Sequence, residues 1–251
     1  DDTPGSVPRQ LAARTAIREI EVSGRRWQFT LTPTAEFRTV RDRSASITVG
    51  ALSILLLGAV GVAMLSLRRA LDAARRWAHE WQFRTGVHHL RALIGAEEAG
   101  SQYADIADAA VGALFPVVAD EFGWRHGPPP GRGAVVLGMG SLGARQLNAA
   151  SDLDLIVIYD PAGAEGSEGP RPLATRPYYA RLTQALLTAL SAPTAAGRLY
   201  EVDMRLRPSG RQGPVATSIE SFRAYQMDEA WTWEHLALTR ARVVGVIPGA
   251  L

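Results

Sequence analysis

The sequence predicts a protein of the α/β (α+β) class, in which a mixed sheet with flanking helices follows a helical pair and one transmembrane helix. Two observations predict this class. Residues 44–67 carry no charged side chain over 24 positions, and about 20 apolar residues can cross a bilayer. After residue 128, short apolar runs bounded by glycine and proline alternate with helical patterns, as in a sheet that carries helices. The expected parts are an extracytoplasmic segment at 1–43, the span at 44–67, a helical segment at 68–127 and the sheet domain at 128–251.

The N-terminal segment is expected to form a β-hairpin. Polar and apolar residues alternate on either side of a Ser-Gly pair, which predicts strands at Glu19–Val22 and Trp27–Leu31. The pattern G-R-x-W-x-F-x-x-T-P at residues 24–33, followed by an apolar span, resembles the membrane-proximal end of a CHASE domain, an extracytoplasmic sensor module of bacterial receptors. Two strands do not fold alone, and the chain begins with Asp1 instead of methionine, so we expect a fragment.

The apolar segment at 44–67 is interpreted as a membrane span. Arginines close both of its ends, with Arg43 before it and Arg68 after it. A buried core helix is the alternative, but core helices are usually shorter and amphipathic. A cleaved signal peptide fits less well, because the apolar run is long and begins after 43 residues.

The elements after the span follow in order. Two helices are expected at residues 71–95 and 96–123, where apolar residues recur every three or four positions. A buried strand is expected at 133–140, a short helix at 141–149 and a second buried strand at 152–160. A loop is expected to follow at 161–172. The last three elements are a helix, a strand and a helix at Tyr178–Leu190, Arg198–Leu206 and Ile219–Leu238.

Composition excludes several classes of protein. Basic residues number 27 and acidic residues 25, and the arginines are scattered, so no nucleic-acid footprint is indicated. The sequence has no cysteine, which excludes disulfides, iron–sulfur clusters and thiolate zinc sites. The histidines lack metal-ligand spacing and are interpreted as structural; they are His79, His88, His89, His126 and His235.

Two aspartates stand at the start of the second apolar strand. Asp152 and Asp154 are two residues apart, so on a strand their carboxylates lie on one face. Two carboxylates this close repel each other and raise one pKa unless a divalent cation lies between them. Hard oxygen ligands suit Mg²⁺, which usually shares its coordination shell with nucleotide phosphates. The preceding turn, with Gly138, Gly140 and Ser141, can bring backbone N–H groups to phosphate oxygens.

A third acid, Asp203, lies on the next expected strand. Arg205 and Arg207 share its face by the same two-residue spacing, which places cations beside it. Each feature alone has a simpler explanation, as an isolated glycine turn, a capped strand or a surface ion pair. In this order and on these elements, the combination favours a nucleotide site.

The same residues carry a resemblance to a known family. A G-S turn, a D-x-D pair on a strand roughly ten residues later and a third aspartate on a later strand resemble the DNA polymerase β-type nucleotidyltransferase fold. Long stretches also closely resemble the C-terminal, adenylylating half of glutamine synthetase adenylyltransferase. They are LGMGSLGARQLNAASDLDLIVIYD, LYEVDMRLRPSGRQGPVATS and EAWTWEHLALTRARVV, within a match of about 175 residues from Leu71 to Val246.

This resemblance implies transfer of AMP from ATP to a tyrosine hydroxyl of glutamine synthetase, with pyrophosphate leaving, in the control of nitrogen assimilation. By position, Asp152, Asp154 and Asp203 would bind Mg²⁺, and Asp203 could help to deprotonate the tyrosine. The residues expected to contact the nucleotide are Gly138, Gly140, Ser141, Arg205 and Arg207. A nitrogen-status signalling protein is a further implied partner. The expected location is the bacterial inner membrane, with a single span and a cytoplasmic catalytic part, or the cytoplasm if the N-terminal segment is foreign.

The glycine turn departs from the family pattern. The family commonly has G-K-L-G-G-R-E, whereas this chain has G-S-L-G-A-R-Q at Gly140–Gln146. Ser141 thus replaces a lysine that could contact phosphate, although serine matches the wider G-S pattern. The chain also stops soon after TRARVV, where the family continues into further helices. A second hypothesis therefore stays open, namely a membrane-anchored sensor remnant whose cytoplasmic part is a non-catalytic scaffold that binds glutamine synthetase.

Overall fold

The computed structural model describes residues 16–22, 25–31 and 68–250, which belong to two compact units, Asp1–Gly61 and Val62–Leu251. The predicted span at 44–67 lies outside the described residues. Among the helices of the described ranges, none combines the length and the apolar character that crossing a bilayer requires.

The first unit contains the expected hairpin. Strands β1 (Ala16–Val22) and β2 (Arg25–Leu31) pair antiparallel, with Glu19 opposite Gln28. The hairpin prediction is therefore confirmed, and both strands are longer than the alternation of polar and apolar residues indicates. The likeness of this segment to a CHASE domain stays a prediction.

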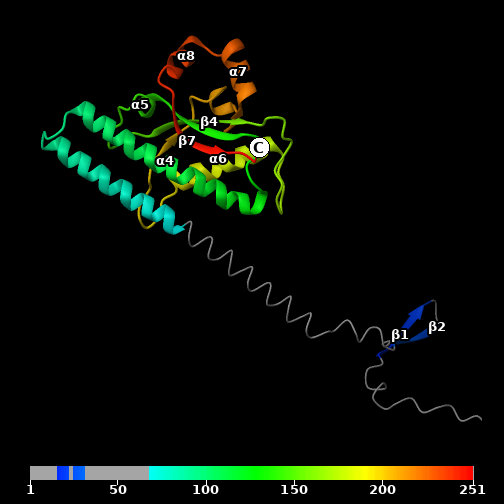
Figure 1. Ribbon diagram of the computed structural model, residues 1–251. Coiled ribbons are helices and arrows are strands. Elements are labelled where there is room, and N and C mark those ends of the chain that lie inside the picture. The colour runs from blue at the N-terminus through cyan, green and yellow to red at the C-terminus, as the bar shows by residue number, and fades with distance from the viewer. Residues whose placement is uncertain (1–15, 23–24, 32–67, 251) are drawn as a thin grey trace, which may run out of the picture. The chain divides into compact units, whose positions relative to one another are not determined.

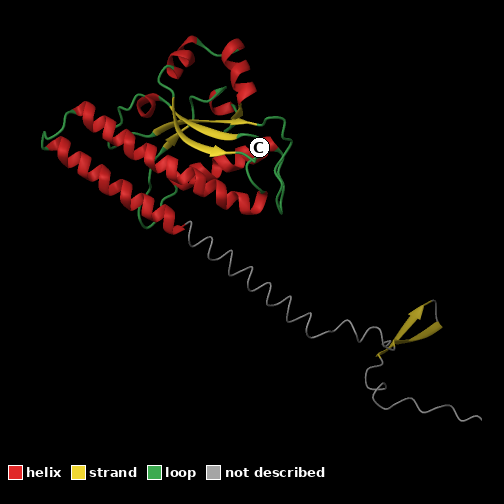
Figure 2. Ribbon diagram, in the orientation of Figure 1, coloured by secondary structure: helices red, strands yellow, loops and turns green. Residues whose placement is uncertain are grey.

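The second unit is built on a mixed sheet of five strands (Figure 2). β3 (Gly133–Gly138) lies between β4 (Leu153–Asp160) and β7 (Arg242–Pro248) and is antiparallel to both. β5 (Val202–Asp203) and β6 (Thr217–Ser218) run parallel to β4, one at the start and one at the end of its other edge. The chain therefore leaves the sheet after β5 and returns to the same edge at β6.

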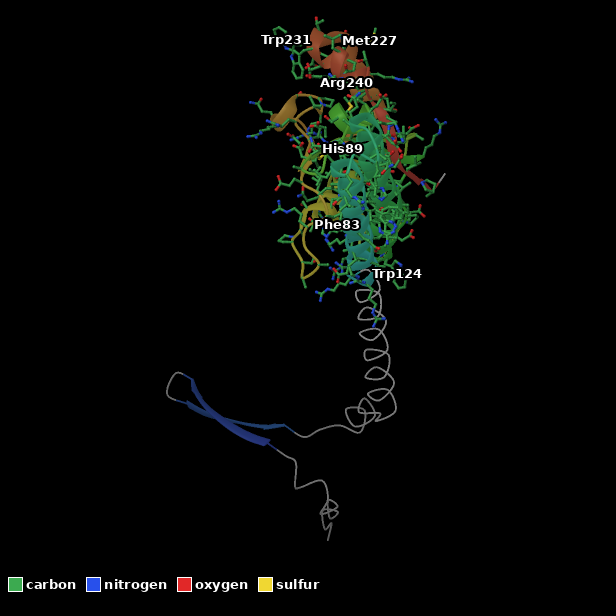
Figure 3. The ribbon with its side chains drawn as sticks, turned by 90° about the vertical axis from the view of Figure 1, so that its left-hand side faces the viewer. Phe83, His89, Trp124, Met227, Trp231 and Arg240 are labelled. Atoms are coloured by element: carbon green, nitrogen blue, oxygen red, sulfur yellow. The ribbon has the colours of Figure 1, made fainter. Side chains whose placement is uncertain are left out.

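Helices cover both faces of this sheet (Figure 1). α4 (Ala96–His126) and α6 (Thr175–Ser191) pack on one face, and residues 68–90 form a further helix beside α4. α7 (Ile219–Asp228) and α8 (Thr232–Leu238) cover the other face. The expected helical pair is thus confirmed, and the α7–α8 end carries exposed apolar side chains, Met227 and Trp231 (Figure 3).

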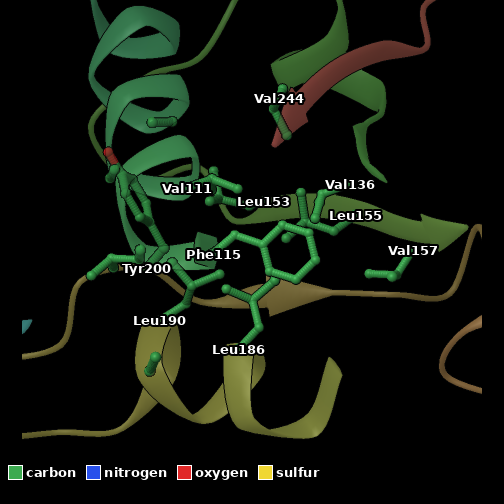
Figure 4. Packing of buried hydrophobic residues seen from close by; sticks show 14 of the residues in the cluster. Val111, Phe115, Val136, Leu153, Leu155, Val157, Leu186, Leu190, Tyr200 and Val244 are labelled. Atoms are coloured by element: carbon green, nitrogen blue, oxygen red, sulfur yellow. The ribbon is translucent and has the colours of Figure 1, made fainter. Parts of the chain in front are cut away.

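The core explains why the apolar run of β4 is uninterrupted. Leu155 and Val157 point into the cluster formed with α4 and α6, around the fully buried Phe115 (Figure 4). Ile156 and Ile158 alternate with them and pack against α7 and α8 on the opposite face. A strand that is covered on both faces needs apolar residues at successive positions, and each such buried side chain stabilises the fold by about 1.5–3 kcal/mol.

The expected strand at Arg198–Leu206 is wrong for most of its length, since only Val202–Asp203 pairs in the sheet. Arg207 closes a turn directly behind β5. Its backbone N–H donates to the Met204 carbonyl oxygen at 3.2 Å, and its guanidinium Nη1 donates to the same oxygen at 2.7 Å. These bonds take the backbone out of the sheet, a competition that side-chain alternation does not reveal.

The single helix expected at Ile219–Leu238 is also wrong, because the chain forms α7 and α8 with a break between them. Glu234 accounts for the break: its carboxylate accepts the backbone N–H of Trp231 and the hydroxyl of Tyr225, both at 2.8 Å. A carboxylate that satisfies a free N–H group starts a new helix.

Strand β7 has no counterpart among the expected elements. Gly245 and Pro248 interrupt its apolar run, so the sequence pattern is weak there. Gly245 serves packing, because a Cβ at this position would lie 3.3 Å from Val111 Cγ1 of α4. The glycine that obscures the strand therefore allows α4 to lie close to it.

Candidate active site

The three predicted acids lie together at the edge where β5 pairs with β4. Asp154 is directly opposite Asp203 on the neighbouring strand, and Asp152 immediately precedes β4. Asp154 alternates in phase with Ile156, which packs on the α7–α8 side of the sheet. Tertiary structure thus brings together carboxylates that stand about 50 residues apart in the chain.

A cleft of about 480 Å³ opens beside these acids. Asp152 and Asp203 line it, and the loop after β5 adds arginines. The full lining consists of Asp152, Glu201, Val202, Asp203, Met204, Arg205, Arg207 and Arg211. The volume suits a small ligand, and the mixture of carboxylates and guanidinium groups suits a polyanion that is bound together with a cation.

The surroundings of Asp154 raise the pKa of its carboxyl group. Burial raises the pKa of this carboxyl above its usual range, and the carboxylates of Asp152 and Asp203 raise it further, while Arg205 lowers it. Three nearby carboxylates with a raised pKa among them have the donor chemistry that a hard divalent cation requires.

Asp203 forms an ion pair with Arg205. Its Oδ1 accepts the backbone N–H of Arg205 at 2.8 Å, and its Oδ2 accepts Nε of the same residue at 2.5 Å. Across residues 68–250 no three acidic or histidine side chains are already spaced to hold a metal ion. The donor set fits Mg²⁺ once Arg205 turns away from the Asp203 carboxylate.

The glycine turn touches this acid cluster directly. α5 (Gly140–Gly143) follows β3, and Gly140 has a φ of +51°, in the left-handed region. A Cβ at Gly140 would lie 2.3 Å from Oδ2 of Asp154. The backbone N–H of Met139 also donates to the Asp154 carbonyl oxygen at 2.8 Å. Glycine is therefore required here both for its backbone conformation and for the space that the carboxylate occupies.

Two other residues of the predicted turn lie differently. Gly138 ends β3 and is buried, and a Cβ there would lie 2.8 Å from the Leu142 side chain, so Gly138 serves the packing of α5 on the sheet. Ser141 is exposed in α5. Neither lines the cleft.

The strand-face argument for the two arginines is wrong, because β5 ends at Asp203. Arg205 nevertheless contacts Asp203, as described above. Arg207 instead braces the loop, since its guanidinium donates to the carbonyl oxygens of Met204, Gly213 and Arg211. It lines the cleft, but most of its donors are occupied within the loop.

Sequence reasoning missed Glu201 and Arg211, which also line the cleft. Glu201 lies two residues before Asp203 within the expected strand, so the spacing rule would have selected it, although β5 begins only at Val202. Arg211 carries no such signal. It reaches the cleft because the loop turns back, with Gly210 N–H donating to the Arg207 carbonyl oxygen at 2.8 Å.

A second cavity, of about 390 Å³, lies between the helix at 68–90 and α4. It is mostly apolar, with Trp77 and Trp81 in its wall. The polar cleft at β5 is therefore the better candidate for phosphate chemistry.

Several histidines bond to backbone carbonyl groups, including His79 to Arg198 and His126 to Arg171, which agrees with their structural interpretation.

Comparison with known proteins gives a consistent result. Residues 59–249 match the glutamate–ammonia ligase adenylyltransferase family. A protein of Mesorhizobium japonicum is 52% identical over 176 residues, which are 70% of this chain and 18% of the relative. A protein of Xanthobacter autotrophicus is 51% identical over 180 residues, 71% of this chain and 18% of the relative. Both are named bifunctional glutamine synthetase adenylyltransferase/adenylyl-removing enzyme. The chain spans about a fifth of the length of these relatives.

Proposed function

The chain belongs to the glutamate–ammonia ligase adenylyltransferase family, and from that membership we propose that its cleft transfers AMP from ATP to a tyrosine of glutamine synthetase. The observation that carries the proposal is the contact of the glycine turn with Asp154, opposite Asp203 and beside an arginine-lined cleft. These parts are the ones that a phosphate-binding turn and a metal-binding acid cluster need.

The chemical step is an in-line displacement at the α-phosphorus of ATP. The tyrosine oxygen forms a bond to this phosphorus, the bond to the bridging oxygen of the β-phosphate breaks, and pyrophosphate leaves. Arg205 and Arg211, which line the cleft, would neutralise the departing pyrophosphate. Asp203 is the proposed acceptor of the tyrosine proton, after its release from Arg205. Mg²⁺, held by Asp152, Asp154 and Asp203, would stabilise the charge on the attacking and leaving oxygens.

The exchange of partners at Asp203 gives the cleft a way to respond to nucleotide. Arg205 is 65% exposed in its side chain, whereas Asp203 is only 13% exposed. The arginine can therefore turn toward a phosphate, while the carboxylate stays in place for the cation. An incoming polyanion and its cation would each take one member of this ion pair.

The direction of the reaction follows from the chain's own motifs. The relatives are named for both addition and removal of the adenylyl group. The stretches W-T-W-E-H and R-L-R-P-S-G-R-Q-G-P of this chain resemble the adenylylating half. We therefore assign addition of AMP to this cleft.

Labelled ATP tests this proposal. The purified full chain is incubated with glutamine synthetase, Mg²⁺ and ATP labelled either in the α- or in the γ-phosphate. We expect glutamine synthetase to gain α-label on a tyrosine and no γ-label. Binding of glutamine synthetase without labelling would support the non-catalytic scaffold instead. The absence of both binding and labelling would refute the enzyme hypothesis and the scaffold hypothesis alike.

The location follows from the substrate. ATP is cytoplasmic, so we place the catalytic part in the cytoplasm. Anchoring to the inner membrane through residues 44–67, and contact with a nitrogen-status signalling protein, stay predictions from the sequence.

A further inference from the structure

The turn formed by α5 needs support from outside itself, because four residues make barely one helical turn. Its position matters to the acid cluster. The Asp154 carboxylate fills the space beside Gly140, so a shift of the turn changes what confines that carboxylate. The support must come from elements packed around α5.

We propose that Arg145 and Arg242 are positioning residues that hold α5 against the acid cluster, with two carboxylates of α4, Asp105 and Asp108, as their anchors. This inference rests on the function proposed above and adds residues to it that stand outside the cleft. Neither arginine is among the residues that line the cleft, so both act through the turn.

Arg242, the first residue of β7, links three elements. Its Nη2 donates to the Leu142 carbonyl oxygen of α5 at 2.9 Å and to Asp108 Oδ1 at 3.0 Å, and its Nη1 donates to Asp108 Oδ2. The side chains of Arg242 and Asp108 are only 27% and 22% exposed, so water screens the pair incompletely. A two-pronged pair fixes the plane of the guanidinium group and, through it, the Leu142 carbonyl group.

Arg145 holds the other side of the turn and has an unusual backbone. Its φ is +58°, in the left-handed region that residues other than glycine avoid. Its Nη2 donates to Ser101 Oγ at 3.2 Å and to Asp105 Oδ1, and its Nη1 lies 3.7 Å from Asp108 Oδ2. Such a conformation persists where surrounding contacts determine it, and here these contacts come from α4.

Close backbone packing makes α4 a firm anchor. A Cβ at Gly100 of α4 would lie 3.2 Å from the Cα of Gln146, directly after Arg145. A Cβ at Gly143, the last residue of α5, would lie 2.0 Å from the carbonyl oxygen of Arg240, just before β7. The turn is therefore confined between α4 and the start of β7, and the two arginines fix its position there.

The test compares Arg242→Met with Arg75→Met in the full chain. Arg75 is the control, because it likewise bonds a carboxylate, that of Asp72, and a backbone carbonyl oxygen, that of Ala189 at 2.9 Å, and is more deeply buried than Arg242. It joins the helix at 68–90 to α6, and its side-chain hydrogen bonds go to Asp72, Ala189 and Ala192, outside α5. The measurements are kcat and KM for ATP, affinity for a non-hydrolysable ATP analogue, and hydrogen exchange at residues 139–146, at a temperature at which both variants stay folded.

We expect Arg242→Met to lower kcat by about 10–100-fold, as for a reacting group displaced by about 1 Å, and to speed exchange at 139–146. Arg75→Met loses thermal stability without either change. Arg242→Lys keeps the charge but lacks the planar fork, so it restores only part of kcat. Arg145→Met is expected to follow Arg242→Met.

Wild-type kcat and unchanged exchange in Arg242→Met would overturn the positioning role, and so would equal losses of kcat in Arg75→Met. Absence of AMP transfer by the wild-type chain would instead refute the proposed function. In that case affinity for the ATP analogue and exchange at 139–146 decide the positioning role independently of transfer.

Discussion

Replacing Gly140 by alanine probes the contact on which the site depends. Gly140 has a φ of +51°, and the added Cβ would lie 2.3 Å from Oδ2 of Asp154. The structure offers a matched control in Gly163, which has a φ of +81° and nothing within 4 Å of the position of an added Cβ. Both substitutions strain the backbone, but only the first displaces a carboxylate.

The sizes of the two effects differ. An alanine in the left-handed region costs about 1–2 kcal/mol, which lowers Tm by roughly 2–4 °C per kcal/mol in a protein of this size. Both variants should show this loss. At Gly140 the carboxylate oxygen must also move by about 1 Å to reach an ordinary C···O contact of about 3.3 Å. It can do so by rotation of the side chain, so the clash changes the position of the carboxylate more than the stability of the fold. A misplacement of this size lowers the reaction rate by about 100-fold.

Thermal unfolding and labelled AMP transfer measure the two effects on the same preparations. We expect Gly140→Ala and Gly163→Ala to have similar Tm values, with the transfer rate lowered, by about 100-fold, only in Gly140→Ala. Equal transfer by both variants would show that the turn does not confine Asp154 during catalysis. Equal loss of transfer by both would trace the effect to backbone strain.

Three further predictions concern other parts of the chain. Burial raises the pKa of Tyr178 from 10.0 to about 12. Because the pKa is higher in the folded state, the stability that the Tyr178 hydroxyl contributes is complete below pH 10 and is lost as the pH rises to 12. Tyr178→Phe removes the hydrogen bond to the Gly127 carbonyl oxygen, so its free energy of unfolding at pH 8 should be about 1 kcal/mol lower. Between pH 10 and 12 that free energy should fall less steeply with pH than in the wild type, and an equal slope in both proteins would contradict this reasoning. Ser141→Lys should preserve or raise AMP transfer if the turn faces phosphate, and a clear loss would place the added charge against another cation. If residues 44–67 span the membrane, protease added to intact cells should remove only the N-terminal end, and digestion of the catalytic part would refute that topology.

The parts of the fold that sequence patterns predicted are those in which packing is periodic. The helix at 68–90, α4 and α6 follow an apolar repeat, and β4 is a continuous apolar run because both of its faces are covered. Two of the failures occur where one side chain bonds to the backbone. Arg207 ends β5 early, and Glu234 divides the last helix. Such bonds depend on residue identity at single positions and leave no periodic signal.

The site divides in the same way. The acids at 152 and 154 were predictable because strand geometry alone puts them on one face, and the structure adds that Asp203 lies opposite. The contacts that support α5 were not predictable. Arg242 bonds Asp108 and Leu142 because β7 pairs with β3, which brings it beside α4 and α5. Pairing between distant segments is a property of topology, and spacing in the sequence does not contain it.

The central claim is that the acid cluster performs AMP transfer, and Asp154→Asn tests it most directly beside Asp160→Asn. Both aspartates lie on β4, but Asp160 is at its far end, where it bonds Arg132 at 3.3 Å. The measurement is the initial rate at which α-labelled ATP labels glutamine synthetase in Mg²⁺. We expect a loss of about 10²–10³-fold in Asp154→Asn, as when one preorganised group that stabilises charge is removed, and a rate near that of the wild type in Asp160→Asn. Equal labelling by the wild type and Asp154→Asn would contradict the assignment of the active site.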